Sequence, residues 1–243
     1  MNIAILYSGG KDSTYAIHHA IEKGWKIKYL ISVKPTRKDC YLFHYATVEQ
    51  TKELSKNFNC KHFLLKCSIA NSNKEAEIVK KLVANNQKSN KLKIDALVLG
   101  GTGLQETQLK SLQKALMPLR IEVFAAHAGL DHDRVIEEMI ARGYKIMITQ
   151  VASDGLMKWL GRVLTAESFK ELQKDSLKYG FHIGFEGGYA DTLVIDAPIF
   201  KKSLKILEYE KIIEDHYCGH IIIKKAKLVN KTALSNSKRI ILD

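Results

Sequence analysis

Residues 6–20, LYSGGKDSTYAIHHA, join an apolar run to a stretch with helical periodicity through a turn rich in glycine. Such a turn presents several backbone N–H groups together, and the N-terminus of the helix adds a partial positive charge. Gly9 and Gly10 allow a ligand to approach the backbone closely, and Lys11 adds a cation. The turn at residues 8–13 therefore predicts a binding site for an anion, most naturally a phosphate.

Apolar runs alternate with helical patterns over the first half of the chain. The strand-like runs are residues 3–7, 26–33, 62–67, 95–100 and 121–126, and the helical patterns are residues 13–23, 46–57, 74–86 and 104–116. This alternation predicts a Rossmann-like, doubly wound α/β domain with five parallel strands over residues 1–126. Ligands of such sheets bind at the carboxyl ends of the strands, where the turn at residues 8–13 lies.

The pattern changes after residue 126. One more helix and strand are predicted at residues 133–143 and 144–152, followed by a polar-faced helical stretch over residues 153–180. A glycine-rich segment then leads into β-like runs, at residues 192–196, 204–209 and 220–229. We predict a smaller α+β substrate-binding domain over residues 127–230 and a weakly held tail over residues 231–243.

The charge is strongly basic, with a formal net charge of +12, and the excess sits at the two ends of the chain. Such a field attracts phosphate groups of a nucleotide or of RNA, but a lysine-rich solvated surface explains it equally well. No apolar stretch reaches the length of a membrane span and no leader segment is evident, so we expect a soluble cytoplasmic protein without a membrane partner. The four cysteines form no CxxC pair and no zinc-ligand cluster, which favours reduced packing residues.

Two well-known phosphate motifs do not fit the chain. The motif G-x-x-x-x-G-K-[ST] needs glycine where Ile5 stands, and Lys11 is followed by Asp12. The dinucleotide motif G-x-G-x-x-G is also absent, because the run that begins at Gly101 ends on Glu106. A P-loop kinase and a Rossmann dehydrogenase are therefore disfavoured.

The run SGGKDS directly after the first strand resembles the signature of the ATP pyrophosphatases, or PP-loop proteins. The resemblance implies that the turn holds the pyrophosphate end of ATP and that the chemistry falls on the α-phosphate. It also implies Mg²⁺ as the companion of ATP, with Asp12 as a metal ligand. The residues expected to bind ATP are Ser8, Gly9, Gly10, Lys11, Asp12, Ser13 and Gly101.

A second motif, FEGGYADTLVIDAPIF at residues 185–200, is similar to one in the diphthine–ammonia ligase family. The resemblance implies that ATP activates the carboxylate of diphthine, a modified histidine of elongation factor 2, as an acyl-adenylate with release of pyrophosphate. Ammonium then gives the amide and AMP, the last step of diphthamide biosynthesis. Free ammonium is the expected nitrogen source, because Asn2 follows the initiator methionine and none of the cysteines has the setting of a glutaminase nucleophile.

The resemblance also suggests roles for residues of both motifs. Acidic residues of the second motif are expected to orient or deprotonate ammonium or to position the acceptor, and its glycines to bring backbone amides near a carboxylate or oxyanion. The expected catalytic residues are Lys11, Asp12, Glu186, Asp191 and Thr192, and the expected substrate-binding residues are His44, Gln108, Glu186, Gly187, Gly188 and Asp196. The alternative for the second motif is a glycine-rich β-turn with solvated acids.

The chain departs from the family pattern where the acceptor is expected to bind. Residues 189–191 read Tyr-Ala-Asp, where the family usually has an acidic, an aromatic and a second acidic residue. After the fourth strand the family tends to show a serine, a Tyr-Gln pair and an arginine, and within residues 105–111 only Gln108 matches this pattern. Three accounts stay open: a divergent diphthamide enzyme, a paralogue that acts on another carboxylate, and a nucleotide-binding module without turnover.

Enzymes that modify RNA are the nearest rivals, because lysidine synthetases and tRNA thiolases use the same loop and the basic charge suits a polyanion. Sulfur transfer is disfavoured without a CxxC pair, and lysidine chemistry by the fit of residues 185–200 to another family. Nucleic acid is thus not the favoured partner. The β-like runs of the second domain are compatible with a homodimer.

Overall fold

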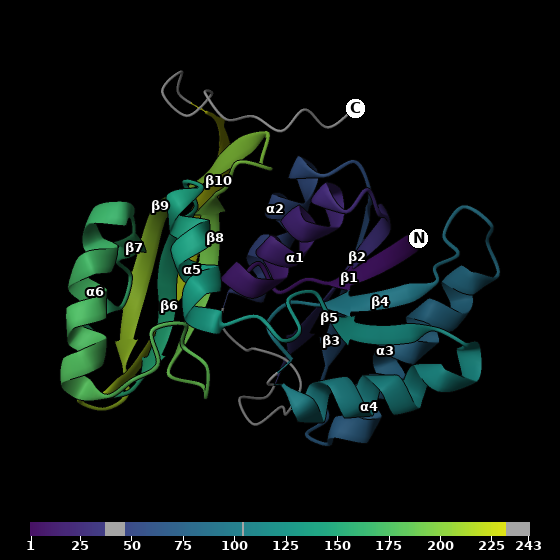
Figure 1. Ribbon diagram of the computed structural model, residues 1–243, viewed down its shortest axis with the longest axis horizontal. Coiled ribbons are helices and arrows are strands. Elements are labelled where there is room, and N and C mark those ends of the chain that lie inside the picture. Colours follow the sequence, from purple (N-terminus) through teal and green to yellow (C-terminus); the bar gives the residue numbers. More distant parts are fainter. Residues whose placement is uncertain (37–46, 104, 232–243) are drawn as a thin grey trace. The chain divides into compact units, whose positions relative to one another are not determined.

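The computed structural model describes residues 1–36, 47–103 and 105–231, and they divide into two compact units. The first unit contains residues 1–8, 12–55 and 59–130, and the second contains residues 9–11, 56–58 and the chain from Asp131 onward. Figure 1 labels the helices and strands of both units. Within the described residues, no helix combines the length and the apolar character that a membrane span requires.

The first unit is built on a parallel sheet with the strand order β3-β2-β1-β4-β5. The strands are β1 (Asn2–Leu6), β2 (Lys26–Pro35), β3 (Lys61–Cys67), β4 (Ala96–Leu99) and β5 (Glu122–Ala125). This confirms the predicted Rossmann-like sheet with five parallel strands. The strand order reverses at β1, because β2 lies on one side of it and β4 on the other. The carboxyl ends of β1 and β4 therefore form the switch point where such sheets bind ligands.

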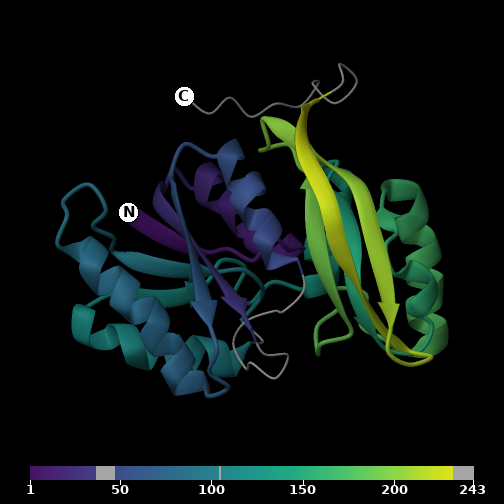
Figure 2. The ribbon, with the colours of Figure 1, turned by 180° about the vertical axis from the view of Figure 1, so that it is seen from behind.

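Helices cover both faces of this sheet, with α1 (Lys11–Glu22) and α2 (Thr51–Leu54) on one face and α3 (Ser72–Gln87) and α4 (Glu106–Leu116) on the other (Figures 1 and 2). The second face buries a continuous apolar core between the strands and the helices. Fully buried members of this core include Ala4, Tyr29, Ile31, Val79, Val83, Leu97 and Leu112. Burial of this kind is the main stabilising contribution to the unit.

The helix predicted over residues 46–57 is interrupted in the structure. Its described part consists of α2 between two 3₁₀ turns, η1 (Val48–Gln50) and η2 (Ser55–Asn57). The hydroxyl of Thr51 donates to the carbonyl of Val48 at 2.6 Å, and that of Ser55 donates to the carbonyl of Lys52 at 3.1 Å. Side-chain hydroxyls that bond backbone carbonyls in this way compete with α-helical hydrogen bonds.

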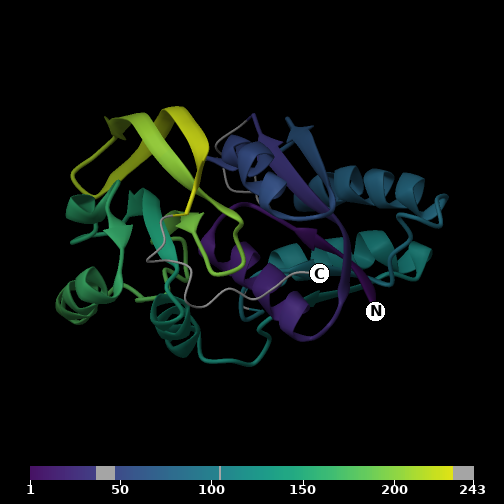
Figure 3. The same cartoon turned by 90° about the horizontal axis from the view of Figure 1, so that it is seen from above.

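The second unit is an antiparallel sheet with the order β7-β6-β10-β9, and β8 also pairs with β6. Its strands are β6 (Lys145–Ala152), β7 (Val163–Leu164), β8 (Ala190–Asp196), β9 (Lys202–Ile213) and β10 (Cys218–Asn230). Two helices, α5 (His132–Ala141) and α6 (Ala166–Tyr179), lie on the same side of this sheet (Figure 3). The α+β character predicted for this part of the chain is confirmed.

The stretch predicted as helical over residues 153–180 contains less helix than expected. Only α6 is an α-helix; Met157–Trp159 form a 3₁₀ turn, η4, and β7 pairs with β6. Gly155 and Gly161 have left-handed φ angles of 77° and 79°, which end helical geometry. The helix α6 starts later, at the N-cap Thr165, which forms a capping box with Ser168.

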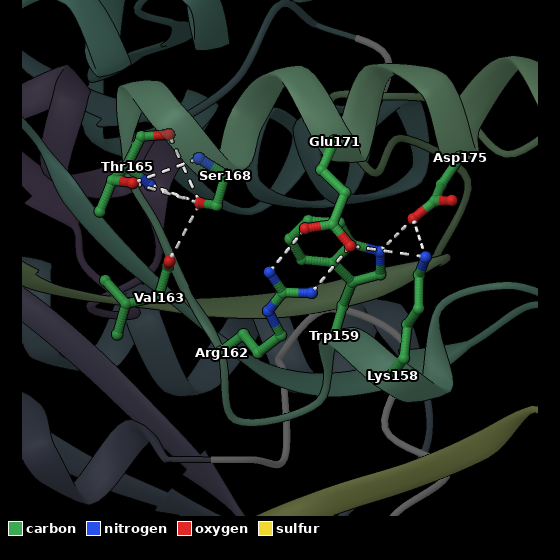
Figure 4. A network of polar contacts seen from close by, with 8 residues as sticks. All are labelled: Lys158, Trp159, Arg162, Val163, Thr165, Ser168, Glu171 and Asp175. Carbon is green, nitrogen blue, oxygen red and sulfur yellow. Dashed lines mark hydrogen bonds and ion pairs between the residues drawn. The ribbon is translucent and has the colours of Figure 1, made fainter.

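Hydrogen bonds and ion pairs connect α6 to residues 158–162 (Figure 4). The buried indole of Trp159 donates to Asp175 at 2.8 Å, and the guanidinium of Arg162 lies 4.0 Å from the centre of the indole ring. Arg162 also forms two hydrogen bonds with Glu171, at 3.1 and 2.8 Å. Lys158 completes the network through an ion pair with Asp175 at 2.7 Å.

Replacing Trp159 by Phe tests this network. The substitution leaves the buried carboxylate of Asp175 without its indole donor, so we expect the free energy of unfolding to fall by about 1–3 kcal/mol. Urea unfolding followed by far-ultraviolet circular dichroism measures the change. As the control, Glu171→Gln weakens two solvent-exposed ion pairs, with Arg162 and Lys158, and is expected to leave the unfolding midpoint nearly unchanged. Equal effects of the two substitutions would contradict the account.

Candidate functional site

The turn that follows β1 is closed by hydrogen bonds between Ser8 and Ser13. The backbone N–H of Ser8 donates to Oγ of Ser13 at 3.2 Å, and the two hydroxyl oxygens lie 3.1 Å apart. Asp12 lies in the first turn of α1, where a negative charge faces the positive end of the helix. Ser13 is buried. The predicted residues Ser8, Asp12 and Ser13 thus lie together at the start of α1.

The carboxyl end of β4 packs directly on this turn. A Cβ atom at Gly100 would lie 2.4 Å from the carbonyl carbon of Asp12 and 2.4 Å from the nitrogen of Ser13. Only a residue without a side chain allows this approach, because both contacts are with backbone atoms. The sequence indicated Gly101 and missed Gly100, although a pair of glycines after an apolar strand was the available signal.

Gly101 has a left-handed φ angle of 92°, and its carbonyl accepts a hydrogen bond from the backbone of His127 at 3.1 Å. A Cβ atom at this position would lie 2.5 Å from Nε2 of Gln105. The predicted residue Gly101 therefore lies beside Gly100 at the switch point, in a conformation that glycine adopts most easily. Gln108 lies further along, in the first turns of α4.

Residues 9–11 of the turn are bonded to β8 within the second unit. The carbonyl of Gly9 accepts from the backbone N–H of Val194 at 2.9 Å, and the backbone N–H of Lys11 donates to Oγ1 of Thr192 at 3.1 Å. Thr192, predicted to be catalytic, therefore supports the main chain of the turn. The side chain of Lys11 is buried, with 4% of the residue exposed.

The second motif forms a strained turn before β8. Phe185 has a left-handed φ angle of 62°, and Gly187 and Gly188 have φ angles of 93° and 83°. A bulky residue with positive φ is an outlier, and such outliers cluster at functional sites. Between them, Glu186 turns its carboxylate toward the buried ring of His132, with 2.6 Å between Oε1 and Nδ1.

The remaining acidic residues of the motif lie on β8. Asp191 pairs with Gln150 beside an irregularity in β6, where Thr149 is the extra residue. Bulges of this kind are enriched next to active sites, where they redirect side chains. Asp196 lies at the end of β8, and one of its carboxylate oxygens is 2.9 Å from Nζ of Lys231 in a buried ion pair. The structure thus places Glu186 and Asp191 at the beginning of the strand and Asp196 at its end.

Two sequence profiles match the chain: the diphthamide synthase N-terminal domain at residues 1–114 and the diphthamide synthase C-terminal domain at residues 131–229. The diphthine–ammonia ligase of Homo sapiens is 25% identical over 236 residues, which cover 88% of this chain and 85% of that protein. That of Danio rerio is 26% identical over 233 residues, covering 88% and 89%. The chain belongs to the diphthine–ammonia ligase family.

As a member of the diphthine–ammonia ligase family, the chain is an enzyme of the ligase class. The relative from Schizosaccharomyces pombe is longer: a match at 23% identity covers 93% of this chain and 39% of that protein. A solved structure described as a predicted subunit of tRNA methyltransferase from Methanocaldococcus jannaschii matches with a TM-score of 0.40 and 13% identity, over 81% of this chain and 97% of that one. A TM-score this low supports no conclusion about the present chain.

Cys60 is a poor candidate for a catalytic nucleophile. Cys60 and Cys67 are free thiols, and burial raises the pKa of Cys60 to about 11. A thiol with so high a pKa is a poor nucleophile at neutral pH.

Among the predicted site residues, His44 lies outside the described residues.

A histidine and a serine that the sequence analysis missed support the end of β1. Ser32 donates its hydroxyl hydrogen to the carbonyl of Tyr7 at 2.5 Å, so its oxygen accepts from Nε2 of His62, 2.8 Å away. Burial lowers the pKa of His62 below its ordinary value of 6.5. A histidine directly before the apolar run FLL of β3 was the signal in the sequence.

Gly100→Ala tests the contact at the switch point. The new Cβ must displace the first turn of α1, so we expect weaker ATP binding and a loss of about 1–3 kcal/mol in the free energy of unfolding. Isothermal titration with ATP and urea unfolding measure the two quantities. Gly24→Ala is the matched control: its Cβ meets nothing within 4 Å, and its left-handed φ costs about 1 kcal/mol without affecting ATP binding. Unchanged ATP affinity in Gly100→Ala would contradict the placement of the site.

The lowered pKa of His62 predicts an acid-sensitive contribution to stability. The unfolded chain binds a proton at this residue more readily than the folded chain, so the free energy of unfolding falls as the pH drops below about 6.5. Above about pH 6.5, the full contribution of His62 to the free energy of unfolding is present. His62→Gln should flatten this part of the stability profile. An unchanged slope in His62→Gln would show that His62 does not titrate differently in the folded protein.

Proposed function

We propose that this protein uses ATP to convert the diphthine carboxylate of elongation factor 2 into the amide of diphthamide. Ammonium is the nitrogen donor, and AMP and pyrophosphate are the other products. The observation that carries the proposal is the glycine turn at the switch point of the parallel sheet, where Gly100 packs on the backbone of Asp12 and Ser13. Family membership supports the choice of reaction and acceptor, since the matched relatives are diphthine–ammonia ligases.

In the first step, a carboxylate oxygen of the acceptor attacks the α-phosphorus of ATP. A P–O bond forms, and the bond to the bridging oxygen breaks, so that pyrophosphate leaves with the electron pair. The backbone N–H groups at the start of α1 and the ammonium group of Lys11 would stabilise the charge on the β- and γ-phosphates. Burial of Lys11 strengthens this interaction, because the lower local dielectric reduces screening.

In the second step, ammonia attacks the acyl carbon of the adenylate. The C–N bond forms, the C–O bond to AMP breaks, and AMP leaves as a phosphate monoester. Starting from ammonium, two protons are released for each amide formed. Glu186 and Asp191 are the proposed groups that orient the nitrogen and accept a proton, and the amides of Gly187 and Gly188 would stabilise the oxyanion.

The residues around Asp12 fit a magnesium ion. Mg²⁺ prefers oxygen ligands, and the carboxylate of Asp12 lies in the same helical turn as the hydroxyl of Ser13, which is 3.1 Å from that of Ser8. Bound Mg²⁺ would neutralise phosphate charge on ATP. Asp12 would hold the ion, and the two serine hydroxyls would bind its waters or phosphate oxygens.

Other predicted residues differ in how well the described geometry supports a direct role. Thr192 is better described as a support of the turn, because its hydroxyl accepts from the backbone of Lys11. Asp196 is engaged by Lys231 and is left out of the proposed acceptor site. Gln108 and His44 remain proposed contacts of the acceptor.

Asp12→Ala tests the proposed chemistry. Loss of the carboxylate should abolish AMP release from ATP in the presence of ammonium and elongation factor 2 that carries diphthine, a loss of roughly 100-fold or more. Chromatographic separation of AMP from ADP provides the measurement. Glu77→Gln, which removes a surface carboxylate paired with Lys80 on α3, serves as the control and should turn over as the unmodified protein does. ADP as the product would contradict adenylation, and recovery of intact ATP would indicate a binding module.

A further inference from the structure

The contact between His132 and Glu186 is built into the second unit by the backbone on both sides. His132 is the first residue of α5, whose N-cap is Asp131, and its side chain is only 3% exposed. Its Nδ1 lies 2.6 Å from Oε1 of Glu186. The Glu186 side chain is 15% exposed, so its carboxylate is largely shielded but still reaches solvent.

The chain around Glu186 has an unusual backbone that makes this contact geometrically feasible. Gly184 is buried, and a Cβ atom there would lie 2.3 Å from Cδ2 of His132. The imidazole therefore packs closely against the main chain two residues before Glu186. Phe185, in between, adopts a left-handed conformation at φ 62° although it has a large side chain. Strain of this kind persists only where the surrounding structure enforces it.

The contact with His132 fixes one of the two carboxylate oxygens of Glu186. Nδ1 of the buried imidazole lies 2.6 Å from Oε1. The second oxygen of Glu186 is then presented in a defined orientation. His182 lies beside the pair, with its ring centre 5.8 Å from that of His132 and its Nε2 3.4 Å from Asp133.

Ammonium is the ligand that fits such an oxygen. It is a small cation with four N–H donors and no acceptor, so it needs a carboxylate whose oxygen is not already neutralised by a cationic side chain. Asp196 does not meet this condition, because it is paired with Lys231. Glu186 fits this requirement better, because the side chain observed at its carboxylate is an imidazole rather than an ammonium or guanidinium group.

We propose that His132 is a positioning residue, which holds Glu186 as the carboxylate that binds ammonium and receives its first proton. This inference rests on the proposed function and names the nitrogen site within it. One proton moves from ammonium to the second oxygen of Glu186, and the nitrogen lone pair attacks the acyl carbon of the adenylate. AMP leaves with the electron pair of the C–O bond, and the second surplus proton goes to solvent.

The test compares two nucleophiles in variants of His132. Hydroxylamine is largely uncharged at neutral pH and needs neither a carboxylate to bind its charge nor a base to release its lone pair. In His132→Leu, we expect the KM for ammonium chloride to rise roughly 10- to 100-fold, the effect of one charge-assisted hydrogen bond. Turnover with hydroxylamine and the release of pyrophosphate should stay within about 2-fold of the unmodified protein.

His132→Asn is the conservative variant, because the amide nitrogen of asparagine takes nearly the place of Nδ1. It should keep the KM for ammonium within about 5-fold of the unmodified protein. Gly184→Ala is an independent variant that leaves both side chains chemically intact. Its Cβ must displace the ring of His132, so it should raise the KM for ammonium as His132→Leu does. His216→Asn, at an exposed histidine of the same unit, is the control.

The outcomes separate this inference from the proposed function. An unchanged KM for ammonium in both His132→Leu and Gly184→Ala would overturn the inference while leaving the proposed function in place. Equal loss of ammonium and hydroxylamine turnover would also overturn it, because a general structural role would then explain the effect. An unmodified protein that releases no pyrophosphate would overturn the proposed function, and the inference with it.

Discussion

The candidate nucleotide site depends on one steric constraint, the contact between the backbone at the end of β4 and the backbone at the start of α1. Gly100 allows this contact because it has no Cβ, and the nearest atoms belong to the main chain of Asp12 and Ser13. The contact lies where the carboxyl ends of the paired strands β1 and β4 meet, at the point where the strand order reverses. Parallel sheets bind ligands at this place because helix N-termini and free strand ends converge there.

In the second unit, the turn that carries Glu186 has backbone conformations that residues with a side chain rarely adopt, at Phe185, Gly187 and Gly188. The strain costs free energy locally, and the packing of β6, β8 and the two helices must offset it. A solvated β-turn would not require such a conformation at a bulky residue. The left-handed Phe185 is therefore the observation on which we base the proposed functional role of the second motif.

Much of the fold could be predicted from the sequence because its signals are local. Apolar runs that alternate with helical periodicity indicated the parallel sheet, and the SGGKDS turn indicated the ligand site at its first strand. The interruption of the helix over residues 46–57 was not predictable from periodicity, because Thr51 and Ser55 bond backbone carbonyls in the folded chain. The helical stretch over residues 153–180 was shortened for a related reason, since Gly155 and Gly161 adopt left-handed conformations.

The site was predicted less completely, because its key contacts join residues far apart in the sequence. Nothing near His132 indicated that it would meet Glu186, and nothing near Ser32 indicated that it would meet His62. The family resemblance pointed to Glu186 and Asp196 alike, and the ion pair of Asp196 with Lys231 became visible only in the structure. Motifs located the site, whereas the partners of the motif residues required the three-dimensional structure.

The most direct test of the account is a crystal structure of the full chain with an ATP analogue whose α,β bridge resists cleavage. The account predicts that the β- and γ-phosphates accept hydrogen bonds from backbone N–H groups of residues 9, 10, 12 and 13, beside Gly100 and Gly101. An analogue bound elsewhere, with this turn unchanged and without phosphate contacts, would contradict it.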